Sequence, residues 1–127
     1  VLYCHATPRS DEEIVTDATT DEKLGAILAG VEARLVVGGH THMQQDRVVG
    51  GIRWINAGSV GLPYEDDIKA FWALLGPDVE LRRTPFDVPA AIRAFESVGH
   101  DDAARFVENF RTAPSRQEAA EYFESLV

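Results

Sequence analysis

Hydrophobic positions recur in two patterns along this chain, and the change between them falls near residue 87. Before it, short apolar runs alternate with polar and glycine-containing segments, which is typical of strands joined by turns. The strands expected here cover residues 1–5, 33–37, 45–49, 52–55, 70–75 and 79–84, and one helix covers residues 21–29. Gly50-Gly51 separates two of these strands, which predicts a tight hairpin.

After residue 87 the apolar positions recur every three or four residues, which predicts amphipathic helices. One helix is expected at 88–98, and another begins at about Asp101. A third follows Ser115, which forms a capping box with Glu118. The whole order predicts an α/β (α+β) fold in a single domain, residues 1–127, with a sheet portion at 1–86 and a helical tail at 87–127.

Composition narrows the class of protein. The chain has 127 residues, 45% of them hydrophobic and 26% charged, which is typical of a globular protein with a buried core. No apolar run approaches the roughly 18–20 residues that cross a bilayer, so no membrane partner is expected. The only cysteine, Cys4, has no partner for an internal disulfide, which favours a cytoplasmic setting. The net charge of -9 argues against a nucleic-acid polymer as partner, although a bound metal would still allow a phosphate substrate.

Three of the four histidines follow expected strands. His5 ends the first strand, and His40 and His42 come directly after the strand at 33–37. Two imidazoles at i and i+2 beyond a strand can point to one side, and neutral imidazole binds zinc, iron, manganese or nickel. If the two strands are parallel neighbours, their carboxyl ends meet and the three rings converge. A chance His-x-His in a loop and a core histidine at position 5 are the alternatives, and His100 is expected on the surface.

Three segments carry a resemblance to a known family. They are Tyr3 to Ser10, Gly39-His40-Thr41-His42 and Asn56-Ala57-Gly58-Ser59-Val60-Gly61. In order and spacing they look like the later motifs of the calcineurin-like metallophosphoesterases, closest to the small prokaryotic phosphodiesterase-like branch. The resemblance covers roughly residues 1–86 and, more loosely, the tail. It implies half of the family's β-sandwich, flanked by helices.

The resemblance also implies roles for single residues. It makes His5 and His40 ligands of one divalent metal and His42 a ligand of a second, with Mn, Fe, Zn or Ni as the candidates. Substrate contacts are expected from Arg9 and Thr41, and support of the ligands is expected from Gly39, Asn56 and Ser59. Thr41 lies between two of the ligands, so support of them is an alternative role for it. The implied reaction is hydrolysis of a small phosphomono- or phosphodiester by a water that two metals activate. The sequence departs mildly from the family at Ala6-Thr7 and at Ala57.

The family's opening motifs, Asp-x-His, Gly-Asp-x-x-Asp and Gly-Asn-His, have no counterpart here. The chain also begins inside an expected strand and without Met, so we expect it to be the C-terminal half of a longer protein or to be completed by another chain. We therefore expect the isolated chain to be inactive. One alternative is a non-catalytic interaction module, completed by a second copy or by another chain. The other is a cupin-type metal barrel, which lacks support because the expected Glu and later His are missing.

Overall fold

A computed structural model of the chain describes residues 1–126. The main sheet contains four strands in the order β1 (Leu2–Tyr3), β2 (Leu35–Gly38), β4 (Ile52–Asn56) and β3 (Gln45–Val49). β1 pairs with β2 in parallel, β2 pairs with β4 in parallel, and β3 and β4 are antiparallel. The strands expected after residue 30 and the expected parallel neighbours are confirmed, as is the mixed α/β fold class, whereas the first strand is shorter than expected.

The hairpin between β3 and β4 turns at Gly50 and Gly51, as the sequence predicts. Both glycines have positive φ, 60° and 82°. Two consecutive positive φ values define the turn whose twist matches that of the flanking strands, and glycine adopts them without steric cost. The hairpin therefore forms from local sequence.

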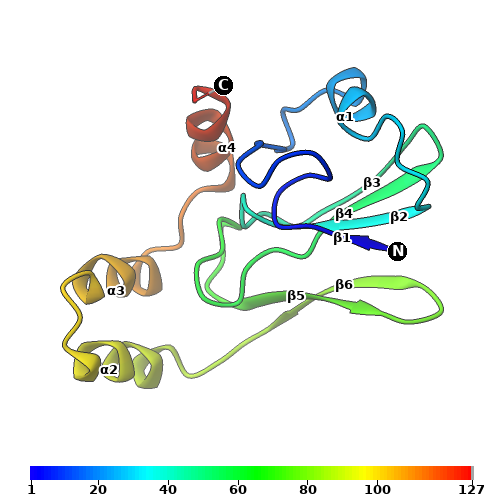
Figure 1. Ribbon diagram of the computed structural model, residues 1–127. Helices are drawn as coiled ribbons and strands as arrows, with labels where there is room; N and C mark the ends of the chain where they lie inside the picture. The colour runs from blue at the N-terminus through cyan, green and yellow to red at the C-terminus, as the bar shows by residue number, and fades with distance from the viewer. Residues whose placement is uncertain (127) are drawn as a thin grey trace.

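Helix α1 (Asp21–Ile27) lies over one face of the main sheet, and the hairpin of β5 (Ala70–Leu75) and β6 (Val79–Thr84) lies on the other side (Figure 1). The Thr20 side chain accepts a hydrogen bond from the backbone N–H of Lys23 and so caps α1. The helix ends two residues before the expected Ala29. Its inner face forms a core with β2 and β4, made of Val15, Leu24, Ile27, Leu28, Val36 and Trp54.

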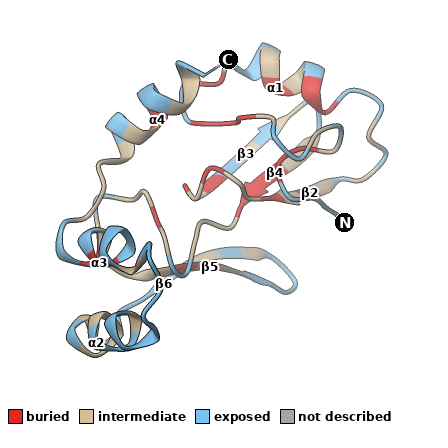
Figure 2. Cartoon of the chain, turned by 60° about the vertical axis from the view of Figure 1, so that its left-hand side comes forward, coloured by how far each residue is buried: buried red, intermediate tan, exposed pale blue. Residues whose placement is uncertain are grey.

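The tail forms three helices, α2 (Val88–Val98), α3 (Ala103–Arg111) and α4 (Arg116–Glu124). Ser115 caps α4 by accepting from the backbone N–H of Glu118, as the capping box predicts. Figure 2 shows that α2 carries no buried residue, whereas α4 lies against the loops above the main sheet. The expected tail extended to residue 127, which lies outside the described residues. No helix within residues 1–126 is long and apolar enough to span a bilayer.

The first strand differs from its prediction. Residues 1–5 were expected to form a buried strand, but β1 contains only Leu2–Tyr3. Val1 and Tyr3 are 68% and 65% exposed, because β1 is the edge of the sheet and has a neighbour on one side only. The apolar run reflects a strand with one covered face, which periodicity cannot distinguish in so short a segment.

Gly38 at the end of β2 allows the closest approach in the core. A Cβ there would lie 2.5 Å from Trp54 Cη2 and 2.6 Å from the Ala6 carbonyl oxygen. We expect Gly38→Ala to lower the free energy of unfolding by about 1–3 kcal/mol, because a buried ring and a backbone must both move. Urea unfolding followed by fluorescence measures the change.

Gly25→Ala in α1 is the matched control for Gly38→Ala. Its Cβ would meet Val49 at 3.4 Å, an ordinary contact, and alanine favours a helix interior over glycine by about 0.5–1 kcal/mol. We expect this variant to be as stable as the wild type or slightly more stable. Equal stability of the Gly38 and Gly25 variants would contradict the packing argument.

Candidate metal centre

The parallel pairing of β1 with β2 brings two histidines together. Beyond the strands, the Gly39 N–H donates to the His5 carbonyl oxygen at 2.8 Å, which continues the pairing by one step. The His5 Nε2 and His40 Nδ1 atoms then lie 3.1 Å apart, and the ring centroids are 5.0 Å apart in an edge-to-face arrangement. The convergence expected of His5 and His40 is thus present in the structure.

The nitrogen-to-nitrogen distance between His5 and His40 suits a shared metal. Two nitrogens bound at about 2.05 Å to one tetrahedral metal lie roughly 3.3 Å apart. The observed 3.1 Å is close to that spacing. In the absence of a metal, the same distance suits a hydrogen bond in which one ring donates and the other accepts. The pair therefore fits two ligands of one metal.

His40 and His42 have an unusual backbone. Their φ values are 67° and 56°, in the left-handed region that few residues other than glycine adopt. The Thr41 N–H donates to the Gly39 carbonyl at 2.8 Å, which closes a three-residue γ-turn around His40. The sequence prediction that strand alternation orients these rings is wrong, because the backbone is not extended here. Such conformations cost about 1–3 kcal/mol each and occur most often at functional sites.

His42 lies next to the pair but has its own partners. Its Nδ1 donates to the Leu62 carbonyl oxygen at 2.9 Å, since a carbonyl can only accept. The proton on Nδ1 leaves Nε2 with a free lone pair, which is the state of a metal ligand. Burial lowers the pKa of His42, the bond to Leu62 raises it by less, and His40 and His5 lower it further. The neutral, ligand-competent form is therefore favoured.

Buried polar groups hold the loop 39–42, which carries His40 and His42. The Asn56 amide donates to the Gly39 carbonyl at 2.7 Å and to Thr41 Oγ1 at 3.0 Å. Its oxygen accepts from the Gly58 N–H at 2.9 Å. Asn56 thus contacts both sides of the loop, which is the kind of position from which a residue supports ligands.

Thr41 has a position that does not favour contact with a substrate. The side chain is 1% exposed, and its hydroxyl donates to the Val15 carbonyl at 3.1 Å while accepting from Asn56. Because both bonds hold it inside the protein, the geometry favours support of the loop. Ser59 is one step further away: its Oγ accepts from the N–H of Leu62, whose carbonyl accepts from His42.

Arg9 is engaged elsewhere. Its guanidinium forms an ion pair with Glu13 and donates to the Ala26 carbonyl of α1 at 3.3 Å. The ion pair raises the pKa of Arg9 and lowers that of Glu13. Arg9 would have to leave Glu13 to bind a phosphate, so its substrate role stays a prediction.

Tyr64 belongs to the site although the sequence analysis did not select it. Its ring stacks on His42 at 5.9 Å between centroids, with the planes 18° apart. Its N–H also donates to the His42 carbonyl at 3.2 Å. Pro63 was the only local signal, since it marks the end of the glycine-containing loop, and nothing in the sequence indicates which loop the following tyrosine contacts.

The set of ligands is small. Within residues 1–126, no group of three or more His, Cys, Asp or Glu side chains is arranged to hold one metal. A cavity of about 430 Å³ lies between α4 and the loops at Asp17 and Asp66, and none of the three histidines lines it. Among the described residues, His5 and His40 therefore form a close pair with His42 beside it, and this pair could supply two nitrogens to one metal.

The parallel strands β1 and β2 deliver His5 and His40 to one edge of an α/β sheet, the edge at which such folds bind ligands. Comparison with solved structures makes the class more specific. The chain matches a hypothetical protein from Pyrococcus horikoshii with a TM-score of 0.73 and 18% identity, over 89% of this chain and 46% of that one. It matches a metallophosphoesterase from Sphaerobacter thermophilus with a TM-score of 0.66 and 19% identity, over 87% of this chain and 54% of that one.

The chain therefore has the metallophosphoesterase fold, as the resemblance of its motifs implies. It spans about half the length of the two solved chains. Searches with models of protein families and against curated proteins give no match. At 18% and 19% identity the structural likeness establishes the fold only, and any activity has to be argued from the residues of this chain.

His42 provides a test of the site in the metal-free chain. We expect its pKa in the folded state to lie below the ordinary value of 6.5. The unfolded chain then takes up the proton first as the pH falls. The stabilisation from neutral His42 is complete above about pH 6.5 and is lost as the pH falls through the folded pKa.

Histidine NMR spectra recorded against pH measure the pKa of His42, with the urea-unfolded chain as reference. The Nδ1–H tautomer should persist in the neutral form. A folded pKa at or above the unfolded one would contradict the assigned burial and bond to Leu62.

Proposed function

We propose that this chain supplies the histidine-bearing half of a metal-dependent phosphoesterase site. The observation that carries the proposal is the 3.1 Å separation of His5 Nε2 and His40 Nδ1, beside a His42 whose Nε2 is free to bind. The metallophosphoesterase fold of the chain supports it. The proposed substrate is a small phosphomono- or phosphodiester.

Each residue has a distinct proposed role. His5 and His40 hold one divalent metal, and His42 holds a second through Nε2. Asn56 and Thr41 keep the loop in its left-handed conformation through their buried bonds. When bound, divalent metals neutralise phosphate charge and lower the pKa of bound water. Zn, Mn, Fe and Ni all accept imidazole ligands, so the donor set fits each of them.

The remaining ligands would come from outside residues 1–127. Two metals held by three histidines leave most coordination positions to other groups, and the described residues offer no larger cluster. The exposed position of His5 at the sheet edge leaves room for such groups. A segment of a longer chain and a second chain are both compatible with this proposal.

Metal titration tests the ligand roles directly. We expect Co²⁺ binding, followed by visible absorption and calorimetry, to weaken roughly tenfold or more in His40→Asn. Asparagine tolerates the positive φ at this position, so the loop should keep its shape. His100→Asn is the control, because His100 is exposed and lies in the turn between α2 and α3. Wild-type affinity in His40→Asn, or equal loss in both variants, would sink the proposed roles.

Activity provides a second test. We expect the chain alone to hydrolyse neither p-nitrophenyl phosphate nor bis(p-nitrophenyl) phosphate faster than the same metal in buffer, because three ligands divided between two metals do not make a complete site. If His40→Asn hydrolyses these substrates as fast as the wild-type chain does, the activity comes from a contaminant. Turnover by the wild-type chain that disappears in His40→Asn would show a complete site and refute the half-site.

A non-catalytic interaction module is the second candidate. One observation favours it: apolar side chains stay exposed on β1 and α2, with Val98 73% exposed. Exposed apolar surface on a sheet edge and a helix suits contact with another chain. A wild-type chain that binds no metal in the titration would favour this candidate over the phosphoesterase half.

A further inference from the structure

Two segments lie side by side at His42. One is 42–44, and the other is 62–65. The His42 ring donates to the Leu62 carbonyl, the Tyr64 N–H donates back to the His42 carbonyl, and the Gln44 N–H donates to the Glu65 carboxylate. The second segment thus determines where the His42 ring lies.

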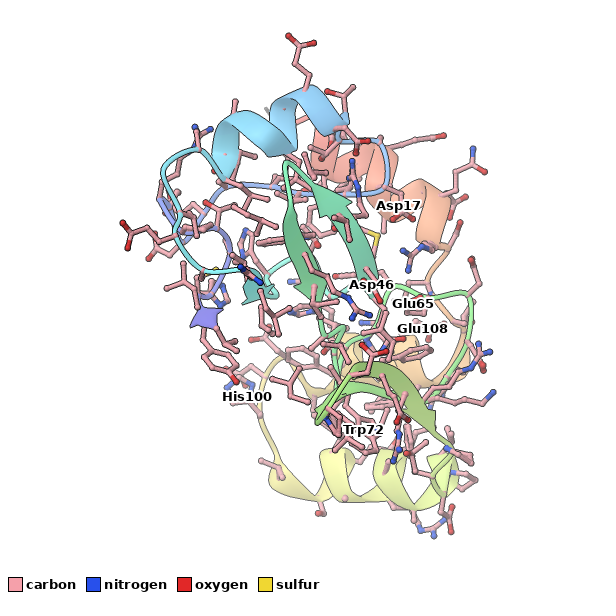
Figure 3. All side chains as sticks on the ribbon, turned by 90° about the vertical axis from the view of Figure 1, so that its right-hand side faces the viewer. Asp17, Asp46, Glu65, Trp72, His100 and Glu108 are labelled. Atoms are coloured by element: carbon pink, nitrogen blue, oxygen red, sulfur yellow. The ribbon has the colours of Figure 1, made fainter. Side chains whose placement is uncertain are left out.

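Helix α4 holds both segments. Arg116, its first residue, pairs with Glu65 at 2.6 Å and donates to the Gln44 carbonyl at 2.7 Å. The same guanidinium pairs with Asp17 at 2.7 Å. Figure 3 shows Asp17 and Glu65 on either side of the start of α4. One arginine therefore joins the segment that carries His42 to the segment that contacts it.

The other end of α4 reaches the same place. Phe123 packs edge-on against Tyr64, with 5.6 Å between ring centroids, and Tyr64 stacks on His42. Glu124 accepts from the hydroxyls of Thr16 and Thr19 at 2.6 and 2.8 Å, which fixes the helix against the loop before α1. Both ends of α4 are thus attached, the first through Arg116 to Glu65 and the last through Phe123 to Tyr64.

We propose that α4 positions His42 for metal binding and that Tyr64 is the positioning residue through which it does so. This inference rests on the proposed function only because it names a metal as what His42 binds. The contacts that connect α4 to His42 do not depend on a metal. The stacked ring prevents rotation of the imidazole, and the Arg116 pairs keep Leu62 within reach of Nδ1. The helical tail thereby becomes part of the site.

The test uses the metal-free chain at neutral pH and ¹⁵N spectra of its histidines. Wild-type His42 should show the Nδ1–H tautomer. Tyr64→Leu removes the flat ring and should shift the His42 signals away from that pattern, whereas Tyr64→Phe keeps the ring and should restore it. Arg116→Met should shift the same signals although it leaves Tyr64 in place.

The signals of His5 and His40 serve as the internal control for folding, and they should stay as in the wild type in every variant. A purely structural role for α4 would disturb all three histidines together. Unchanged His42 signals in both Tyr64→Leu and Arg116→Met, or an equal change in Tyr64→Phe, would overturn the inference.

A Co²⁺ titration of the same variants separates the two proposals. Absence of metal binding in the wild type contradicts the proposed function and leaves the spectral result intact. If the wild-type chain binds Co²⁺ through His5 and His40 but no variant changes the His42 signals, the positioning role is contradicted and the proposed function is not.

Discussion

The parallel pairing of β1 with β2 is the constraint on which the candidate centre depends. Only this register places the His5 carbonyl opposite the Gly39 N–H, and only then do the His5 and His40 nitrogens face each other at 3.1 Å. Gly38 makes the register possible, since any side chain there would collide with Trp54 and the Ala6 carbonyl. The closeness of the two histidine rings is thus a consequence of the backbone pairing and of the missing Cβ at Gly38.

A buried polar network stabilises the loop of His40 and His42 in its strained backbone conformation. Trp54 Nε1 donates to Gln45 at 2.9 Å, Gln45 donates to the Val15 carbonyl at 3.3 Å, and Thr41 donates to the same carbonyl. Among the residues described, no buried side-chain nitrogen or oxygen lacks a partner. Fully satisfied networks make a core rigid, because each member would lose its bond if the loop relaxed. The left-handed histidines persist for this reason.

Sequence reasoning recovered what is local and missed what is distant. The strands, the Gly50-Gly51 turn and the approach of His5 to His40 follow from periodicity and from the rule that parallel strands end together. The exposure of β1 could not be predicted, because the residues of a strand do not show whether it has a neighbour on one side or on both. The position of α4 did not follow either, since Glu124 bonds to Thr16 across 108 positions of sequence. The conformation of His40 and His42 depends on Asn56 and Leu62, whose partners no pattern reveals.

The order of strands also has a kinetic consequence. The β3–β4 hairpin closes through two glycines, whereas β1 must find β2 across more than 30 residues, as the 33-residue separation of Cys4 from its partner Val37 illustrates. Local pairs form within microseconds and distant pairs form later, because the entropy of closing a long loop comes first. On this principle the β3–β4 hairpin is expected to form before β1 pairs with β2. The approach of His5 to His40 is accordingly expected late in folding, so a metal that needs both rings would bind only after β1 has paired with β2.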